Sequence, residues 1–384
     1  MKMLVLGAGL QGSACAYDLL KDPDVTEVRI ADLHIDSLPP FLAKAPGADR
    51  KLKPLKLDVR DRAAVVAAMK GCDAAMSAIP YYFNYEMAEC AVEAGVHFSD
   101  LGGNTEIVFQ QKKLDAEAAK KKISVMPDCG LAPGMVNILA QLGISRLDSV
   151  DAVKIYVGGL PQHPQAPLNY QIVYSLEGVL DYYTTLSWVL RNAKRTQVKA
   201  LSELESVNFP APIGTLEAFH TAGGLSTMAF RYEGKVPTME YKTLRYPGHA
   251  KIMEAIRDLG LLEQEPIDVN GVKVSPRAVA VATMGPRLTK PESADLVALR
   301  VIVSGKKGGK PKTFEWDLVD RYDESTGISS MERTTGFSLA ITGLMQARGQ
   351  VTALGVRTPD EAMPADAYIA ELRKRGIDIK ETVR

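Results

Sequence analysis

Apolar and polar positions alternate in short blocks along the first third of the chain. Apolar, β-favouring runs occupy residues 3–7, 27–32, 52–59, 73–80, 96–100 and 123–128. Helix-spaced segments separate them, namely LQGSACAYDLL, DRAAVVAAMKG, YEMAECAVEAG and EIVFQQKKLDAEAAKKK. Six short strands with intervening helices predict a parallel sheet covered on both faces. We therefore expect an α/β protein that begins with a Rossmann-type, doubly wound domain over residues 1–134.

The pattern changes after residue 134. Strand-like segments follow at 150–161, 239–246, 266–274, 298–307 and 312–322, with hairpin turns among them. A helix pattern covers 248–260. We expect a second, mixed α+β domain over residues 135–330. The pattern is helical again over residues 331–384, which we expect to pack on the first domain and complete it.

A glycine motif, GAGLQG, directly follows the first strand. Gly7, Gly9 and Gly12 end that strand and open a helix, whose N-terminal N–H groups and dipole can receive a pyrophosphate. Asp32 ends the next strand, about 20 residues later, as the dinucleotide motif requires. A carboxylate there accepts hydrogen bonds from the ribose and repels a 2′-phosphate, which favours NAD over NADP. The alternative is a tight turn without a ligand.

The other strand ends should line the same crevice. Asp58 and Val59 are expected near the adenine, with Ala78, Ile79 and Pro80 beside the nicotinamide; ordinary core packing is the alternative for Ala78 and Ile79. The predicted cofactor-binding residues are Gly7, Gly9, Leu10, Gln11, Gly12, Asp32, Asp58, Val59, Ala78, Ile79 and Pro80.

Composition narrows the class of protein. Lys+Arg and Asp+Glu both number 46, so no overall attraction to nucleic acid is expected. No apolar run is long enough to span a membrane. The four cysteines form no CxxC pair and no zinc pattern, which favours reduced thiols and a cytoplasmic protein. No metal-hydrolase, nucleophile-elbow or P-loop motif occurs.

Several segments, VLGAGLQG, PDCGLAPGMVN, YVGGLP, YSLEGVLDYY and YKTLRYPGH, resemble the saccharopine dehydrogenase-like family, and within it the lysine 6-dehydrogenase branch. The resemblance runs nearly from end to end. It implies a Rossmann domain joined to a substrate and dimerisation domain, in a homodimer or a dimer of dimers. It also implies NAD-dependent oxidative deamination of the L-lysine ε-amine to α-aminoadipate semialdehyde, which cyclises to piperideine-6-carboxylate.

Two positions depart from the saccharopine-forming members. Those enzymes commonly read GLDPG and YCGGLP, where this chain has Ala132 and Val157. The missing carboxylate and thiol argue against saccharopine chemistry and agree with the lysine branch.

Oxidising an amine by hydride transfer requires a neutral amine, a base and a place for the rest of the substrate. Glu177 lies in a segment poor in other charges and, if buried, is a candidate base; a carboxylate at a helix start is the alternative. His220, beside Thr221, is a candidate for proton transfer or a structural histidine. Tyr81 follows the fourth strand and can stack on the nicotinamide or pack in its loop.

Candidate substrate contacts lie in both domains. Tyr241 and Arg245 share one face of a strand, and Arg245 is the expected partner of a substrate carboxylate, unless that face is exposed. Asp100, beside a glycine pair, contacts the substrate or caps the next helix. Asn169 is a further polar candidate.

Two rival functions remain open at this point. One is a saccharopine- or carboxynorspermidine-type reductase that joins an amine and an aldehyde. The other is a non-catalytic NAD-binding sensor.

Overall fold

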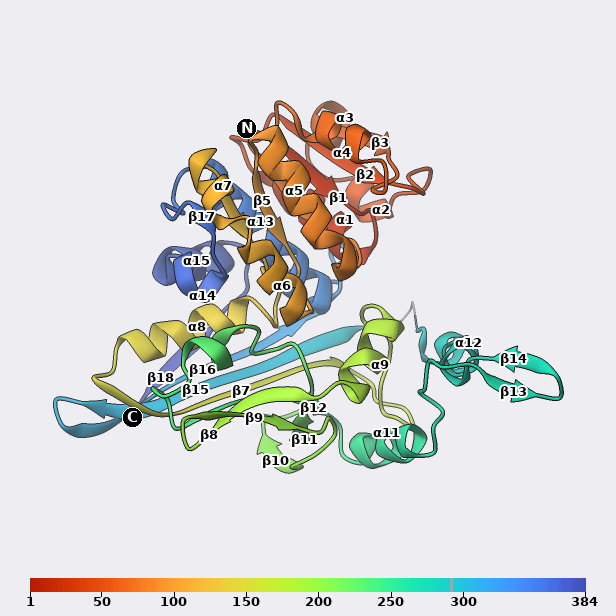
Figure 1. The fold of residues 1–384 in the computed structure, drawn as a ribbon, viewed down its shortest axis with the longest axis vertical. Coiled ribbons are helices and arrows are strands. Elements are labelled where there is room, and N and C mark those ends of the chain that lie inside the picture. The colour runs from red at the N-terminus through yellow and green to blue at the C-terminus, as the bar shows by residue number, and fades with distance from the viewer. Residues whose placement is uncertain (291–292) are drawn as a thin grey trace.

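The computed structural model describes residues 1–290 and 293–384 and contains two large sheets (Figure 1). The first sheet has seven parallel strands in the order β17-β6-β5-β4-β1-β2-β3. Their bounds are β1 Lys2–Leu6, β2 Glu27–Asp32, β3 Leu52–Lys56, β4 Ala74–Ser77, β5 His97–Asp100, β6 Ser124–Met126 and β17 Gly355–Val356. The order reverses between β1 and β4, as in doubly wound dinucleotide-binding folds. The predicted fold class is therefore confirmed.

Helices cover both faces of this sheet because its central strands are apolar on both sides. Met3 and Val5 pack toward α1 (Leu10–Lys21) and α13 (Ser330–Ala347), whereas Leu4 and Leu6 pack toward α4 and α5. The remaining helices here are α2 Pro40–Ala43, α3 Ala48–Lys51, α4 Arg62–Met69, η1 Tyr81–Phe83, α5 Asn84–Ala94, α6 Thr105–Lys112 and α7 Asp115–Lys120. The single helix expected over 106–122 is thus two helices.

The second sheet has the order β10-β11-β12-β7-β15-β16-β18, and β8 and β9 extend it beside β12. Only the β12–β7 pairing is parallel. The strands are β7 Ser149–Pro161, β8 Ser187–Arg191, β9 Lys194–Val198, β10 Glu205–Asn208, β11 Thr215–His220, β12 Thr238–Arg245, β15 Asp295–Lys307, β16 Lys310–Arg321 and β18 Lys380–Val383. The sequence pattern missed β8 to β11, which are short; in β9 the first four residues are polar.

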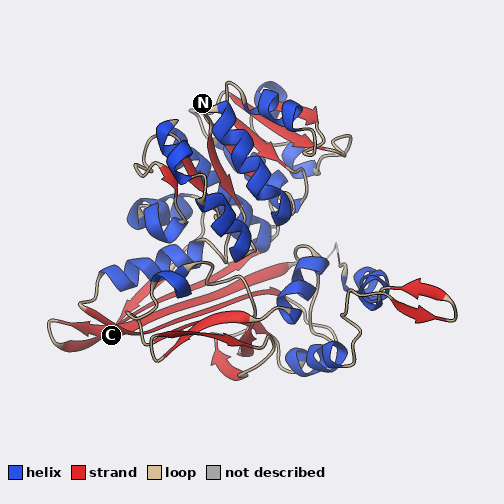
Figure 2. Cartoon of the chain, viewed as in Figure 1, coloured by secondary structure: helices blue, strands red, loops and turns tan. Residues whose placement is uncertain are grey.

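Helices line the second sheet at its edges and on the side facing the first sheet (Figure 2). They are α8 Met135–Ser145, α9 Leu176–Thr184, α10 Met228–Arg231, α11 His249–Asp258 and α12 Pro276–Leu288. A separate hairpin, β13 (Ile267–Val269) and β14 (Val272–Val274), projects from the body beside α12. No helix in the described part of the chain is long and apolar enough to cross a membrane.

The C-terminal segment joins both sheets. Helix α13 packs on α1, since any side chain at Gly336 would meet Ala14 and the Gln11 carbonyl at 2.7 Å. Strand β17 extends the first sheet, followed by α14 (Pro359–Ala362) and α15 (Ala365–Lys374). Strand β18 then pairs with β16 of the second sheet. Assigning 331–384 to the first domain remains a prediction, with β18 outside it.

Candidate active site

The glycine loop leaves the N-terminus of α1 open. Gly7 has φ +97°, and a Cβ there would lie 2.8 Å from the Ala78 carbonyl oxygen. A Cβ at Gly12 would overlap the carbonyl of Gly7, whereas one at Gly9 would meet nothing within 4 Å. Two glycines therefore serve close packing. Gly9 leaves space in front of a helix start that no side chain caps, which is where a pyrophosphate can approach.

Asp32, at the end of β2, lies next to this loop. Its Oδ2 accepts the Ala8 N–H at 2.7 Å, and its Oδ1 accepts the His34 N–H at 2.8 Å. Farther along the edge, Asp58 pairs with the exposed Arg60, whose hydrogen bonds lower the pKa of Asp58 to about 2. The position predicted for the ribose thus carries an oriented carboxylate, and the position predicted for the adenine carries a charged pair.

The other predicted cofactor residues follow the same sheet edge. Ala78 lies against the glycine loop, Ile79 is half-buried and Pro80 is exposed. Leu10 is 51% exposed, at the mouth of the crevice. The side-chain amide of Gln11 has its nitrogen and oxygen both buried without a hydrogen-bond partner. An open helix start, an unpaired amide and an oriented carboxylate together fit a pyridine dinucleotide.

Asp128, just past β6, is a buried carboxylate that the sequence analysis did not select. It has φ +65°, is 2% exposed and accepts a hydrogen bond from Ser226 at Oδ2. Oδ1 packs against Gly102 and makes no hydrogen bond of good geometry, although the nearby Gly103 N–H lowers the pKa of the carboxyl. No Lys, Arg or His in the described residues lies within ion-pair distance of it. Burial, with a contribution from Asp100, raises the pKa of Asp128 to about 7.

Asp100 is completely buried and holds the loops around Asp128. Its carboxylate accepts hydrogen bonds from Gln111 Nε2 at 2.7 Å, the Gly102 N–H at 2.8 Å and the Asp128 N–H at 3.3 Å. Burial raises the pKa of Asp100 to about 6. It does not cap the next helix, because Asn104 takes that role. We infer that Asp100 acts by positioning Asp128.

Two tyrosines of the second domain, Tyr182 in α9 and Tyr241 in β12, face these loops. A Cβ at Gly103 would lie 3.0 Å from the Tyr182 hydroxyl, and one at Gly223 would lie 3.1 Å from its ring, so Tyr182 sits between the two glycines. Gly224 likewise leaves room for the ring of Tyr241. Burial raises the pKa of Tyr182, and Tyr241, Asp128 and Tyr81 add to the shift. Tyr182 therefore lies near Asp128, Tyr81 and Tyr241, and we call the region around these side chains the candidate cleft.

Tyr81 lies near Tyr182, and Arg245 lies near Tyr241. Tyr81 follows β4 in η1 and is half-buried; burial and the Asp181 carboxylate raise its pKa. Arg245 ends β12 on the same strand face as Tyr241 and is 2% exposed. Its guanidinium lies over the Tyr170 ring at 4.8 Å, and no described carboxylate pairs with it. A buried arginine without an acid can bind a substrate carboxylate.

The structure does not bring His220 to this cleft. His220 pairs with Lys242 across the sheet, so it projects from the face opposite Tyr241 and Arg245. There its Nε2 lies 3.1 Å from Glu203, and Glu240 completes a set of groups able to hold a metal. The guanidinium of Arg191 already bridges both glutamates at 2.7 Å, so a cation is built into that set.

Two other predicted residues have local roles. Glu177 is exposed in the first turn of α9, because Leu176, Val179, Leu180 and Tyr183 form the buried face of that helix. It is therefore not a buried base in this structure. Asn169 is half-buried at φ 49°, and its N–H donates to the Gln165 carbonyl at 2.9 Å. It turns the loop that brings Tyr170 beneath Arg245.

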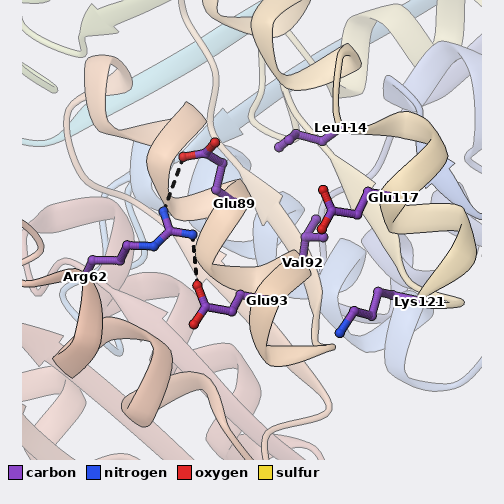
Figure 3. Close-up of a pocket in the computed structure, with 7 residues that line it drawn as sticks. All are labelled: Arg62, Glu89, Val92, Glu93, Leu114, Glu117 and Lys121. Carbon is purple, nitrogen blue, oxygen red and sulfur yellow. Dashed lines mark hydrogen bonds and ion pairs between the residues drawn. The ribbon is translucent and has the colours of Figure 1, made fainter.

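A surface pocket lies elsewhere, among α4, α5 and α7 (Figure 3). Arg62 pairs there with Glu89 and Glu93, and the other lining residues are Val92, Leu114, Glu117 and Lys121. It belongs to the outer helix layer, away from the strand ends, and we assign it no role in the chemistry.

Comparisons with known proteins cover the whole chain. The model of the saccharopine dehydrogenase NADP binding domain matches residues 3–126, and that of the saccharopine dehydrogenase C-terminal domain matches residues 130–377. Saccharopine dehydrogenase (NADP(+), L-glutamate-forming) of Saccharomyces cerevisiae is 24% identical, over 99% of this chain and 98% of the relative. Carboxyaminopropylagmatine dehydrogenase of Synechocystis is 21% identical, over 100% and 98%.

Solved structures share the fold. The apo saccharopine dehydrogenase (L-Glu forming) of S. cerevisiae superposes with a TM-score of 0.80 at 21% identity, covering 100% of this chain and 99% of that one. The homospermidine synthase of Legionella pneumophila, in complex with NAD, gives a TM-score of 0.69 at 10% identity, covering 100% and 91%.

The raised pKa of Asp128 predicts a stability effect that depends on pH. A carboxyl whose folded pKa lies above its unfolded value is ionised at a cost, so the free energy of unfolding falls between about pH 4 and pH 7. Asp128→Asn should therefore raise it at about pH 8 by on the order of 2–4 kcal/mol, and change it little near pH 4. Denaturant unfolding at the two pH values measures this.

Asp115→Asn is the matched control. Burial raises the pKa of Asp115, but hydrogen bonds from Val356 and Arg357 lower it overall, so this substitution should destabilise the protein at the higher pH. Equal stability of Asp128→Asn and wild type at both pH values would contradict the account.

Proposed function

The chain belongs to the saccharopine dehydrogenase family. We propose that it oxidises a secondary amine whose nitrogen links an amino acid to a second carbon chain, and that hydrolysis of the resulting imine gives an amine and a carbonyl compound. In reverse, it would join an amine and a carbonyl compound. The observation that carries this proposal is that a buried carboxylate without a cation, Asp128, and a buried guanidinium without a carboxylate, Arg245, lie on either side of Tyr182 and Tyr241. The names of the full-length relatives support it, and favour it over our sequence-based preference for lysine deamination.

The residues of the cleft divide the work of such a reaction. Bound nicotinamide would supply the hydride acceptor or donor. Asp128, with a pKa near 7, is suited to take the proton from a substrate ammonium and to return one when water adds to the imine. Arg245 would hold a carboxylate of the substrate. Tyr182 and Tyr241 would enclose the chain between these ends and exclude water.

Lysine ε-deamination is the second candidate, and two positions favour it. Ala132 and Val157 stand where saccharopine-forming members commonly carry a carboxylate and a thiol. A primary amine needs the same base and the same hydride transfer, and only the second half of the substrate is absent. The two functions therefore differ in substrate length rather than in chemistry.

We propose NAD as the preferred cofactor, although the matching domain model and the yeast relative are named for NADP. Asp32 is oriented by Ala8 and His34 at the ribose position, and its charge repels a 2′-phosphate. No arginine follows it directly.

A substrate survey tests the function. Purified protein is incubated with NAD⁺ or NADP⁺ and either saccharopine or lysine, and with NADH plus amine and aldehyde pairs, while the absorbance of the reduced cofactor is followed. Oxidation of the secondary amine supports the main proposal, and oxidation of lysine alone supports the second candidate. Asp128→Asn should lower kcat by about 10²–10⁴-fold in either case. Cofactor binding without turnover of any amine would overturn both in favour of a sensor.

Replacing Asp32 tests the cofactor assignment. Asp32→Ser should weaken NADH binding by about tenfold, since a charge-assisted hydrogen bond is lost, while NADPH binding improves. Fluorescence titration of both reduced cofactors measures the two dissociation constants. Asp49→Ser, at an exposed carboxylate in α3 that is not among the predicted cofactor contacts, is the control and should leave both constants unchanged. Tighter binding of NADPH than NADH by the wild type would refute the NAD assignment.

A further inference from the structure

Arg245 donates hydrogen bonds to groups that have no role in the proposed reaction. Its Nε donates to the Tyr183 hydroxyl at 3.2 Å, and its Nη1 donates to the Leu244 carbonyl at 2.9 Å. The structure gives its Nη2 no acceptor among the described residues. Glu217 stands opposite Arg245 in the sheet, but its carboxylate accepts the N–H groups of Gly248 and Ala250. Nε and Nη1 are therefore held, whereas the end of the guanidinium that carries Nη2 is free and the charge is left uncompensated.

The Tyr183 hydroxyl continues to His249. The two side chains are each 1% exposed, and the hydroxyl lies 3.0 Å from Nε2 of His249. Nδ1 of the same ring lies 3.0 Å from the Leu168 carbonyl, which only accepts. Nδ1 therefore carries the proton of the neutral ring and Nε2 accepts from Tyr183. The hydroxyl then has its lone pairs free for Arg245.

Several features keep the His249 ring neutral and fixed in orientation, so that each hydrogen bond in this series keeps the same donor and acceptor. Burial, and then the charge of Arg245, lower the pKa of His249 to about 3, so the ring stays neutral. Phe219 stacks on the His249 ring with an interplanar angle of 4°. Glu217 caps the start of α11, which carries His249, through the two N–H groups named above. Ring, hydroxyl and guanidinium are thus fixed before any ligand arrives.

We propose that Tyr183 and His249 are positioning residues that aim the free edge of Arg245 into the cleft, which makes it a preformed receptor for a carboxylate. The inference rests on the proposed function for the identity of the natural ligand, but the receptor itself needs no turnover. A preformed receptor pays little ordering entropy on binding, so its affinity depends on the fixed geometry. Removing the hydroxyl should free the guanidinium to rotate and to find other acceptors.

Binding of glutarate, a dicarboxylate without an amine, tests the receptor. Isothermal titration of the NADH-loaded wild type should detect glutarate, and Tyr183→Phe should weaken it by about 10- to 100-fold, as for loss of a hydrogen bond to a charged group. Tyr232→Phe, which removes a buried hydroxyl bonded to Gln141 outside the cleft, should bind as the wild type does. His249→Phe should weaken binding and His249→Gln, which retains an acceptor, should restore most of it.

The outcomes separate this inference from the proposed function. Glutarate binding that is lost in Tyr183→Phe, without turnover of any amine by the wild type, would support the receptor and overturn the reaction. With an active enzyme, Tyr183→Phe should raise KM for carboxylate substrates and leave kcat nearly unchanged. Unaltered glutarate affinity in both Tyr183→Phe and His249→Phe, or no glutarate binding by the wild type, would overturn the inference.

Discussion

A buried carboxylate that no cation neutralises is the feature on which the cleft depends. Asp128 is placed at the end of β6 in a left-handed conformation, and Asp100 fixes it through its main-chain N–H. Ser226, in the loop between β11 and α10, supplies its one side-chain partner among the described residues, and Oδ1 makes no hydrogen bond of good geometry. An unpaired buried acid is costly, and such a cost is retained most often where a proton or a cationic group of a ligand must be received.

The two sheets contribute different kinds of group to one site. The parallel sheet supplies loops rich in backbone N–H groups, which suit phosphates and hold the two aspartates. The second sheet supplies side chains, and strand alternation divides them between its faces. Tyr241 and Arg245 lie on the face of β12 that is turned to the cleft, and His220 lies on the other face. On that other face, Arg191 forms ion pairs with Glu203 and Glu240. One strand, β12, therefore carries a binding face and a structural face.

The sequence predicts the features that depend on residues close together along the chain. The glycine loop and Asp32 follow from spacing along adjacent elements, and six strands of the first sheet follow from apolar runs. The sequence also contains enough information to predict that Glu177 is exposed, because the apolar residues at helical spacing in α9 form a buried stripe that does not include it. The face of His220 depends on a pairing register that no pattern in the sequence specifies. Asp128 and Tyr182 became candidates only when folding placed residues far apart in sequence beside each other.

The most direct test of the account is a crystal structure with reduced cofactor and a bound amine substrate. We expect the pyrophosphate at the start of α1, and the amine nitrogen within hydrogen-bond reach of Asp128 Oδ1, about 2.6–3.2 Å. The substrate carboxylate should lie on Arg245. An amine bound elsewhere, with Oδ1 of Asp128 still unpaired, would contradict the central claim.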